Sequence, residues 1–248
     1  MAELPNVQAP LLVLPDDASL LQLLVSAALA SYFGTETKFS ILSKNPAHAV
    51  QLRKFVENVS VRSDLPSSQY ILTLKSPDVQ VKSVRWEQQA GKVQIYLDLQ
   101  AGTLVENQLQ LTLPEKTTDL IVLLGNTTVN GLDPDLSENN DLFQNVAIFG
   151  IGSELNLGDD YQYTTSNLER LSTLGEQALE TLNEQKLTAN VAQLLMAAIF
   201  LETDYLKTGV KTSEIFLSLK KLADAGAQTA DCAEIITSLT SIDNAQRG

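Results

Sequence analysis

Short apolar runs alternate with longer stretches of helical periodicity, both at the start of the chain and after residue 118. The runs at residues 11–14, 38–42, 120–124 and 146–149 are rich in Val, Ile, Leu and Phe and are too short for buried helices. Runs that are apolar on both faces are typical of parallel strands covered by helices. The pattern therefore predicts a buried, mainly parallel sheet.

Helical patterns occupy most of the chain between and after these runs. Pro15-Asp16-Asp17-Ala18-Ser19 precedes an apolar stretch that ends at Phe33 before Gly34. Pro and Asp favour a helix start and Gly a helix end, and the lack of a polar face predicts a helix inside the core. Further helices are expected at residues 46–58, 166–184, 188–207, 213–225 and 231–239.

Residues 69–113 have a different pattern, in which apolar and polar positions alternate along four runs. Turn sequences separate the runs at residues 76–78, 90–92 and 101–102. Odd-numbered positions from 93 to 99 are apolar, whereas positions 94, 96 and 98 are polar. This alternation predicts an antiparallel meander with one face toward solvent, in which Trp86 is expected to pack rather than to line a ligand site.

The elements together predict an α/β fold, a doubly wound and mainly parallel sheet of the Rossmann type with an inserted antiparallel β-meander. The meander, at about residues 69–113, is expected to interrupt a single domain that spans residues 1–248. Neither an internal repeat nor a low-complexity linker is visible in the sequence. A second independent domain is therefore not expected.

Charge and composition narrow the classes of function. The net charge of −13 repels phosphate backbones and acidic membranes, so nucleic acid is a disfavoured partner and a membrane is not expected. No run reaches the length of a membrane span, no secretory signal is visible, and Cys232 is the single cysteine, which excludes an internal disulfide. A cytoplasmic location is expected.

Seven residues at or near the ends of predicted elements form the candidate ligand site, because parallel sheets bind ligands beyond the carboxyl ends of their strands. Asp16 and Asp17 suit either half of a metal site or a helix N-cap. The glycine turns suit either a cradle of backbone N–H groups for an anion or tight turns. The seven residues are Asp16, Asp17, Gly125, Asn126, Gly150, Gly152 and Glu202.

Four segments resemble the N-terminal domain of the DHH-family phosphoesterases, which include RecJ-like exonucleases, nanoRNases and pAp phosphatases. They are LLVLPDDASLLQLLVSAALASYF, DLIVLLGNTTVNGL, NVAIFGIGSELNLGDD and VAQLLMAAIFLETDYLKTGVKTSEIFLSLKKLADAGAQ, and the resemblance covers most of residues 10–228. It implies a site in which two Mn²⁺ or Mg²⁺ ions, held by Asp and His at strand ends, activate a water molecule. It also implies a second, substrate-clamping domain that this sequence does not match.

The metal ligands that the resemblance implies are replaced in this chain. The family's DHH triplet falls on Gly150-Ile151-Gly152, and the aspartate that ends the preceding strand falls on Gly125. A later aspartate falls on Glu202, with Asp204 two residues on, and the only histidine, His48, lies outside every motif. No metal, cofactor or catalytic residue is therefore expected.

The sequence predicts a catalytically inactive DHH-like protein that acts as a binding or structural subunit. Self-association, or capture of a protein partner, is expected through the β-meander. One alternative is a residual or altered phosphoesterase for small nucleotides or short oligonucleotides, built from Asp16, Asp17, Glu202 and Asp204. The other is a metal-independent nucleotide sensor that uses the two glycine turns.

Overall fold

The computed structural model divides the chain into two compact units. The α/β unit comprises Met1–Leu65 and Thr118–Gly248, and the hairpin unit comprises Pro66–Thr117. No helix among the described residues is long and apolar enough to cross a membrane. The structure describes residues 4, 7–34, 37–57, 59–64, 71–89, 91–105, 108–112, 118–125, 146–152, 163–165, 171, 173–208 and 213–246.

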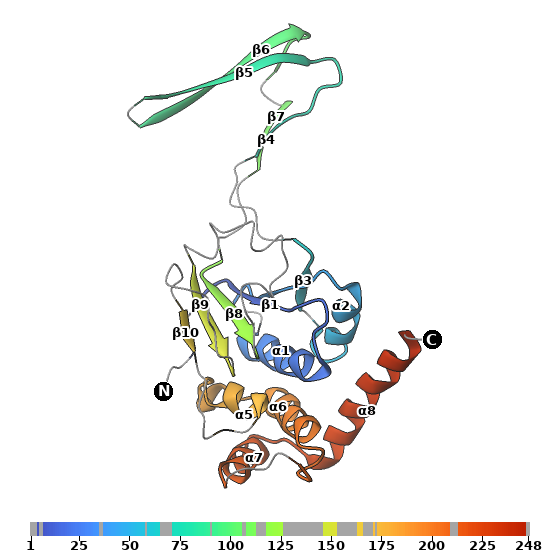
Figure 1. Cartoon of the computed structure of the whole chain (residues 1–248). Coiled ribbons are helices and arrows are strands. Elements are labelled where there is room, and N and C mark those ends of the chain that lie inside the picture. Colours follow the sequence, from blue (N-terminus) through green and yellow to red (C-terminus); the bar gives the residue numbers. More distant parts are fainter. Residues whose placement is uncertain are drawn as a thin grey trace. The chain divides into compact units, whose positions relative to one another are not determined.

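The α/β unit is built on a six-stranded parallel sheet with the strand order β10-β9-β8-β1-β2-β3 (Figure 1). Its order reverses at β1, because the chain places β2 and β3 on one side of β1 and β8, β9 and β10 on the other. This Rossmann-like α/β arrangement confirms the predicted fold class. The strands are β1 (Pro10–Val13), β2 (Ser40–Leu42), β3 (Ser60–Arg62), β8 (Leu120–Leu124), β9 (Ala147–Ile151) and β10 (Tyr163–Thr165).

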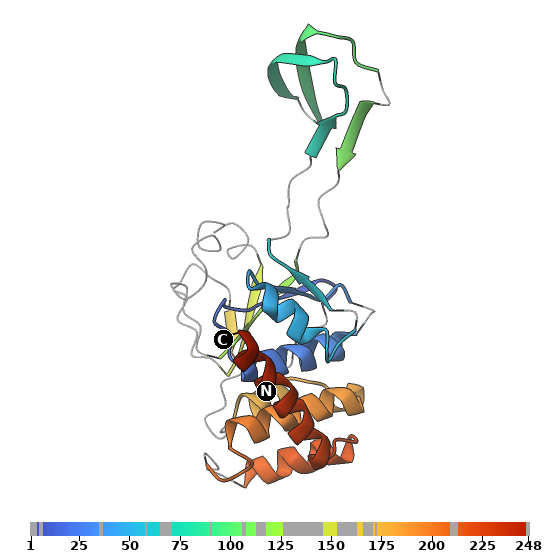
Figure 2. The ribbon, with the colours of Figure 1, turned by 90° about the vertical axis from the view of Figure 1, so that its right-hand side faces the viewer.

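The first helix, α1 (Leu20–Phe33), lies inside the core as predicted. Every residue from position 23 to position 30 is buried, and the helix lies between the sheet and α6 (Ala189–Glu202) (Figures 1 and 2). Its N-cap is Ser19, which forms a capping box with Gln22, and it ends at Gly34 with a φ of 61°. Glycine adopts this left-handed conformation without the steric cost that a Cβ imposes.

The C-terminal helices form a second layer around α6. Helix α6 contacts α1, α5, α7 and α8, and an almost continuous buried stretch from position 191 to position 200 makes it the central helix that its apolar sequence predicts. The helices around it are α5 (Leu174–Leu179), α7 (Glu214–Asp224) and α8 (Thr229–Gln246), with a short 3₁₀ helix, η3 (Glu184–Lys186), after α5.

Some predicted boundaries are wrong. Helix α2 (Pro46–Leu52) stops six residues before the predicted end at residue 58, because turns follow and lead into the unpredicted strand β3. In place of a helix from residue 166 to residue 184, α5 begins after Thr173, where a capping box with Glu176 satisfies the first backbone N–H groups. Residues 166–170 and 172 of that predicted helix lie outside the described residues.

The hairpin unit contains two antiparallel two-stranded sheets whose strands are nested rather than sequential. The outer pair is β4 (Ile71–Leu74) with β7 (Leu109–Thr112), and the inner pair is β5 (Gln80–Gln89) with β6 (Lys92–Ala101). The antiparallel strands are as predicted, but the meander order is wrong. The turn sequences at 76–78 and 101–102 connect the two sheets instead of closing hairpins, and only the turn at Gly91 joins adjacent paired strands.

Alternation along β5 and β6 produces one apolar and one polar face, as the sequence predicts. The apolar face is nevertheless exposed: Trp86, which was expected to pack, is 68% exposed, and its cross-strand neighbour Ile95 is 52% exposed. A two-stranded sheet has no partner layer of its own to cover this face. The prediction that Trp86 packs within this region is therefore wrong for the single chain.

Candidate functional site

The carboxyl ends of β1, β2, β8 and β9 meet at one edge of the parallel sheet. Asp16 and Asp17 follow β1, Ser43 follows β2, Gly125 follows β8 and Gly152 follows β9. In this fold class the edge beside the strand-order reversal is the usual place for a ligand. The parallel pairing of these strands places their carboxyl ends on the same side of the sheet.

Two glycines turn the chain at this edge, and a third lies inside a strand. Gly125, with a φ of 70°, donates its N–H to the carbonyl of Ile151 at 2.9 Å and so ties β8 to β9. Gly150 is a buried member of β9, paired with Leu123 on one side, because the strand runs on to Ile151. The prediction that Gly150 begins the turn after the strand is therefore wrong, and Gly152 takes that place. Asn126 lies outside the described residues.

Gly152 supports packing between the sheet and α5. Its φ is 64°, and a Cβ placed on it would lie 2.6 Å from Cδ1 of Leu174. A real Cβ does not approach another carbon atom this closely, so the Leu174 side chain would have to move. The positive φ is also strained for any residue with a Cβ, and together these two features account for the glycine without a ligand.

Gln22 is a member of this edge that the strand-end pattern did not single out. Its side-chain Nε2 donates to the carbonyl of Leu124 at 3.2 Å, and its Oε1 accepts from the backbone N–H of Ser19 at 2.9 Å. The amide therefore links the start of α1 to the end of β8. The Ser19-x-x-Gln22 spacing is a capping-box signature, so this signal was available in the sequence.

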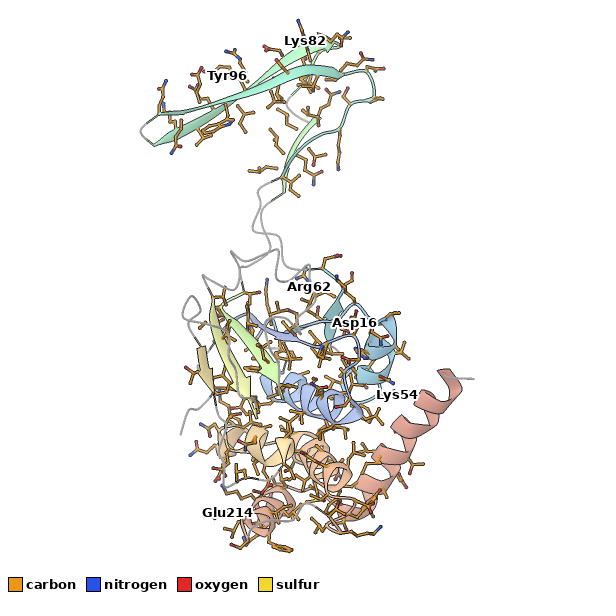
Figure 3. All side chains as sticks on the ribbon, in the orientation of Figure 1. Asp16, Lys54, Arg62, Lys82, Tyr96 and Glu214 are labelled. Atoms are coloured by element: carbon orange, nitrogen blue, oxygen red, sulfur yellow. The ribbon has the colours of Figure 1, made fainter. Side chains whose placement is uncertain are left out.

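Asp16 and Asp17 lie in an exposed turn between β1 and α1 (Figure 3). Neither is the N-cap of α1, because Ser19 has that role. The backbone carbonyl of Asp16 accepts a hydrogen bond from Nδ2 of Asn45 at 3.0 Å, which links this turn to the start of α2. The interpretation of these aspartates as N-caps is therefore wrong.

His48 joins the same edge, although the sequence placed it outside every motif. Its ring is buried, with Nδ1 at 2.7 Å from Oγ of Ser43 and Nε2 at 3.2 Å from Nδ2 of Asn45. Asn45 is held in one orientation, because its Oδ1 accepts from the N–H of Ala47 and its Nδ2 donates to Asp16. Nε2 of His48 therefore accepts, and Nδ1 carries the hydrogen that is donated to Ser43.

This arrangement favours a neutral imidazole. Burial lowers the pKa of His48 from 6.5, and the negative charge of Asp16 opposes that effect only in part. Because Nδ1 donates to Ser43, the ring does not accept the serine proton as the base of a Ser–His pair would. Through these hydrogen bonds the cluster holds together the turn after β1, the end of β2 and the start of α2.

Glu202 supports the start of α5 rather than joining the aspartates. Its Oε2 accepts from the backbone N–H of Leu174 at 2.8 Å. Burial of the carboxylate raises the pKa of Glu202, the Leu174 hydrogen bond lowers it, and the nearby charge of Glu176 raises it. Two carboxylates therefore accept hydrogen bonds from backbone N–H groups at the start of α5. One is Glu176 of the capping box, and the other is Glu202.

The candidate carboxylates do not converge. Within the described ranges, no three Asp, Glu, His or Cys side chains come together in a way that could hold a metal ion. The groups that do meet at the strand ends are backbone amides and carbonyls, the Gln22 amide and the Ser43–His48–Asn45 cluster. These groups form hydrogen bonds with one another, as expected for groups that hold the fold together.

Comparison with known proteins gives similarity to solved structures but no match to a sequence family. No protein-family model matches the chain. No curated protein sequence matches it either. Among solved structures, the chain is similar to an exopolyphosphatase-related protein from Bacteroides fragilis, with a TM-score of 0.47 and 11% sequence identity. The alignment covers 92% of this chain and 56% of that protein, so this chain spans about half of its length.

Proposed function

We propose that this chain is a catalytically inactive relative of the DHH phosphoesterases and acts as a binding or structural subunit. The observation that carries the proposal is the bonding at the carboxyl ends of β8 and β9. The N–H of Gly125 is donated to Ile151, and the Gln22 amide is donated to the carbonyl of Leu124. These bonds use the backbone at the position where the family resemblance implies metal-binding carboxylates.

The residues at the implied metal site do not fit a pair of metal ions. Divalent ions of this kind need several oxygen or imidazole ligands from side chains. Gly125 and Gly150 have no side chain, and Gly150 lies within β9, paired with Leu123 of β8 and Thr165 of β10. The His48 ring already bonds to Ser43 and Asn45 through both nitrogens.

The remaining carboxylates have structural environments that support the same proposal. Glu202 holds the first turn of α5 through Leu174, at the end of α6. Asp16 and Asp17 are exposed, and the hydrogen bond from Asn45 to Asp16 uses the backbone carbonyl of Asp16 rather than its carboxylate. Each group can be explained without substrate chemistry.

A hydrolysis assay tests the proposal. The purified chain is incubated with pAp and with short oligonucleotides in the presence of Mn²⁺ or Mg²⁺, beside the Asp16→Ala variant. We expect no product above the level of the buffer for either protein. Hydrolysis by the wild-type chain that disappears in Asp16→Ala would overturn the proposal and favour the altered phosphoesterase. Far-UV circular dichroism establishes that the variant is folded.

A further inference from the structure

We propose that two copies of this chain associate through the apolar face of the β5–β6 hairpin. The inference rests on the proposed role as a binding or structural subunit and adds the surface and the partner. Most of the exposed large hydrophobic side chains among the described residues belong to the hairpin unit, which has about a fifth of the sequence. They are Ile71, Leu72, Val81, Val84, Trp86, Val93, Ile95, Val105, Leu109 and Leu111.

The register of β5 and β6 gathers the largest of these side chains on one face. Val84 lies opposite Leu97, Trp86 opposite Ile95, and Gln88 opposite Val93. Residues opposite one another in an antiparallel pair point to the same side of the sheet, and so do positions two apart along a strand. The face defined by Val84, Trp86, Val93, Ile95 and Leu97 is called here the Trp86 face.

The opposite face of the hairpin is polar, and its side chains interact with one another. Oγ of Ser83 donates to Asp98 at 2.6 Å, and the hydroxyl of Tyr96 lies 3.5 Å from Glu87. The guanidinium of Arg85 lies 5.0 Å from the centre of the Tyr96 ring. Polar groups therefore pair across this face, and the Trp86 face is the side without polar partners.

The extent of the Trp86 face indicates that it requires a cover. The face spans five positions of each strand, 84–88 and 93–97, or about 17 Å by about 10 Å. Four of its side chains, Val84, Trp86, Val93 and Ile95, are more than half exposed. A contiguous apolar cluster of this kind, unlike scattered single side chains, marks an interaction site. An isolated two-stranded sheet is also marginally stable in water, so a second layer would stabilise the hairpin itself.

Charge favours a second copy as the occupant. Residues 66–117 contain five basic and five acidic residues, so the entire net charge of −13 belongs to the α/β unit. Two copies therefore repel one another wherever their α/β units approach, whereas their hairpin units carry no net charge to oppose contact. The sequence of the hairpin unit contains no cluster of basic residues that would attract an anionic membrane.

The geometry of the face suits a two-fold symmetric pair. The Trp86–Ile95 pair lies between the Val84–Leu97 and Gln88–Val93 pairs, near the middle of the hairpin. A two-fold axis through this point would place the same apolar side chains of both copies against each other, about 10 Å between sheets. The interface is smaller than that of a permanent dimer, so we expect association that depends on concentration.

Contact through the face is favoured over addition of strands at the edge. The register of β5 against β6 shifts between Gln80 and Val81 and again before Ser83. An irregular strand of this kind offers a poor template for further backbone pairing. Its side chains, in contrast, keep their alternation from Ser83 to Gln89.

The single tryptophan of the chain makes the proposal directly testable. Sedimentation velocity and Trp86 emission are measured on the full chain over a wide range of concentration. We expect a shift from monomer to dimer with rising concentration, accompanied by a blue shift of the emission as Trp86 becomes buried. A chain that stays monomeric with solvent-exposed emission throughout, or that blue-shifts only with neutral lipid vesicles, would overturn the proposal.

Neighbouring residues on opposite faces supply a matched pair of variants. Ile95→Lys places a charge on the Trp86 face and is expected to weaken association at least tenfold. Gln94→Lys places the same charge one residue away on the polar face and is expected to leave it within twofold. A dimer that resists Ile95→Lys rejects the face as the interface. The hydrolysis assay is independent of these measurements, so either proposal can fail while the other stands.

Discussion

The α/β unit buries most of its large apolar side chains, whereas the hairpin unit exposes many of them. In the α/β unit, strands β1 and β8 are buried at every position, and α1 lies between two layers. In the hairpin unit, strands of equally regular pattern leave Val84, Trp86 and Ile95 exposed. Apolar side chains become buried only where a second layer covers them. Helices cover the parallel sheet, whereas the two strands of the hairpin have no second layer.

The same contrast applies to charge. The α/β unit carries the whole net negative charge and buries most of its large apolar side chains. Its surface therefore repels the α/β unit of a second copy. The hairpin unit is neutral and exposes its apolar side chains. Under the proposed association, the hairpin unit provides the contact surface and the α/β unit does not.

The largest expected difference between the units comes from the same substitution made in each. Leu24 is fully buried in α1, whereas Leu111 of β7 is 57% exposed. Leu24→Ala is expected to lower the free energy of unfolding by about 2–5 kcal/mol, through lost burial and the cavity left behind. Leu111→Ala is expected to change it by less than about 0.5 kcal/mol in the monomer.

Two measurements follow these changes separately. Far-UV circular dichroism during urea denaturation follows the α/β unit, because every described helix belongs to it, and hydrogen exchange of the β5 and β6 backbone amides follows the hairpin unit. Equal losses in the two variants would contradict the contrast between a closed core and an open face.

A smaller difference is expected from two glycines. A Cβ on Gly175 of α5 would lie 2.8 Å from Cγ1 of Ile199 and 3.1 Å from the carbonyl oxygen of Leu195. Gly175→Ala is therefore expected to destabilise the α/β unit by about 1–2 kcal/mol, although alanine ordinarily favours a helix. Gly91 meets nothing within 4 Å but has a φ of 79°, so Gly91→Ala should cost the hairpin unit about 1 kcal/mol of backbone strain.

The same two measurements separate these effects. Gly175→Ala should shift only the circular dichroism transition, and Gly91→Ala should speed only the hydrogen exchange of the β5 and β6 amides. Stabilisation by Gly175→Ala would show that α5 and α6 do not approach each other as closely as the structure indicates.

The smallest expected effect is on the pH dependence of the α/β unit. Burial lowers the pKa of His48 in the folded chain, so the unfolded chain binds a proton first as the pH falls below about 6.5. The stability contributed by the buried neutral ring is therefore present above that pH and is lost as the pH falls toward the lowered pKa. Hydrogen exchange of the β5 and β6 amides, corrected for the intrinsic effect of pH, should not show this loss of stability, since His48 lies in the α/β unit.

His48→Asn supplies the control, because an asparagine amide can still donate to Oγ of Ser43 but has no imidazole to protonate. Its urea midpoint, followed by circular dichroism, is expected to vary less than that of the wild-type chain between neutral pH and the onset of carboxylate titration. An unchanged slope in His48→Asn would assign the pH dependence to other groups.

Much of the fold could be predicted from local patterns. The apolar runs at 11–14, 38–42 and 120–124 are strands within one or two residues of their observed ends, and α1 ends before Gly34 as expected. The candidate site was predictable only in part. Gly125 and Gly152 lie at strand ends, but Gln22 and His48 reach the same edge through contacts that strand-end residue types do not signal.

The sequence by itself determined which residues share a strand face and where the principal strands and α1 lie. These properties depend on residue type and short-range periodicity. Only the tertiary structure decided the nested pairing of β4 with β7, the hydrogen bond from Gln22 to Leu124, and the exposure of Trp86. Each of these depends on which distant segments meet, and local periodicity carries no information about that choice.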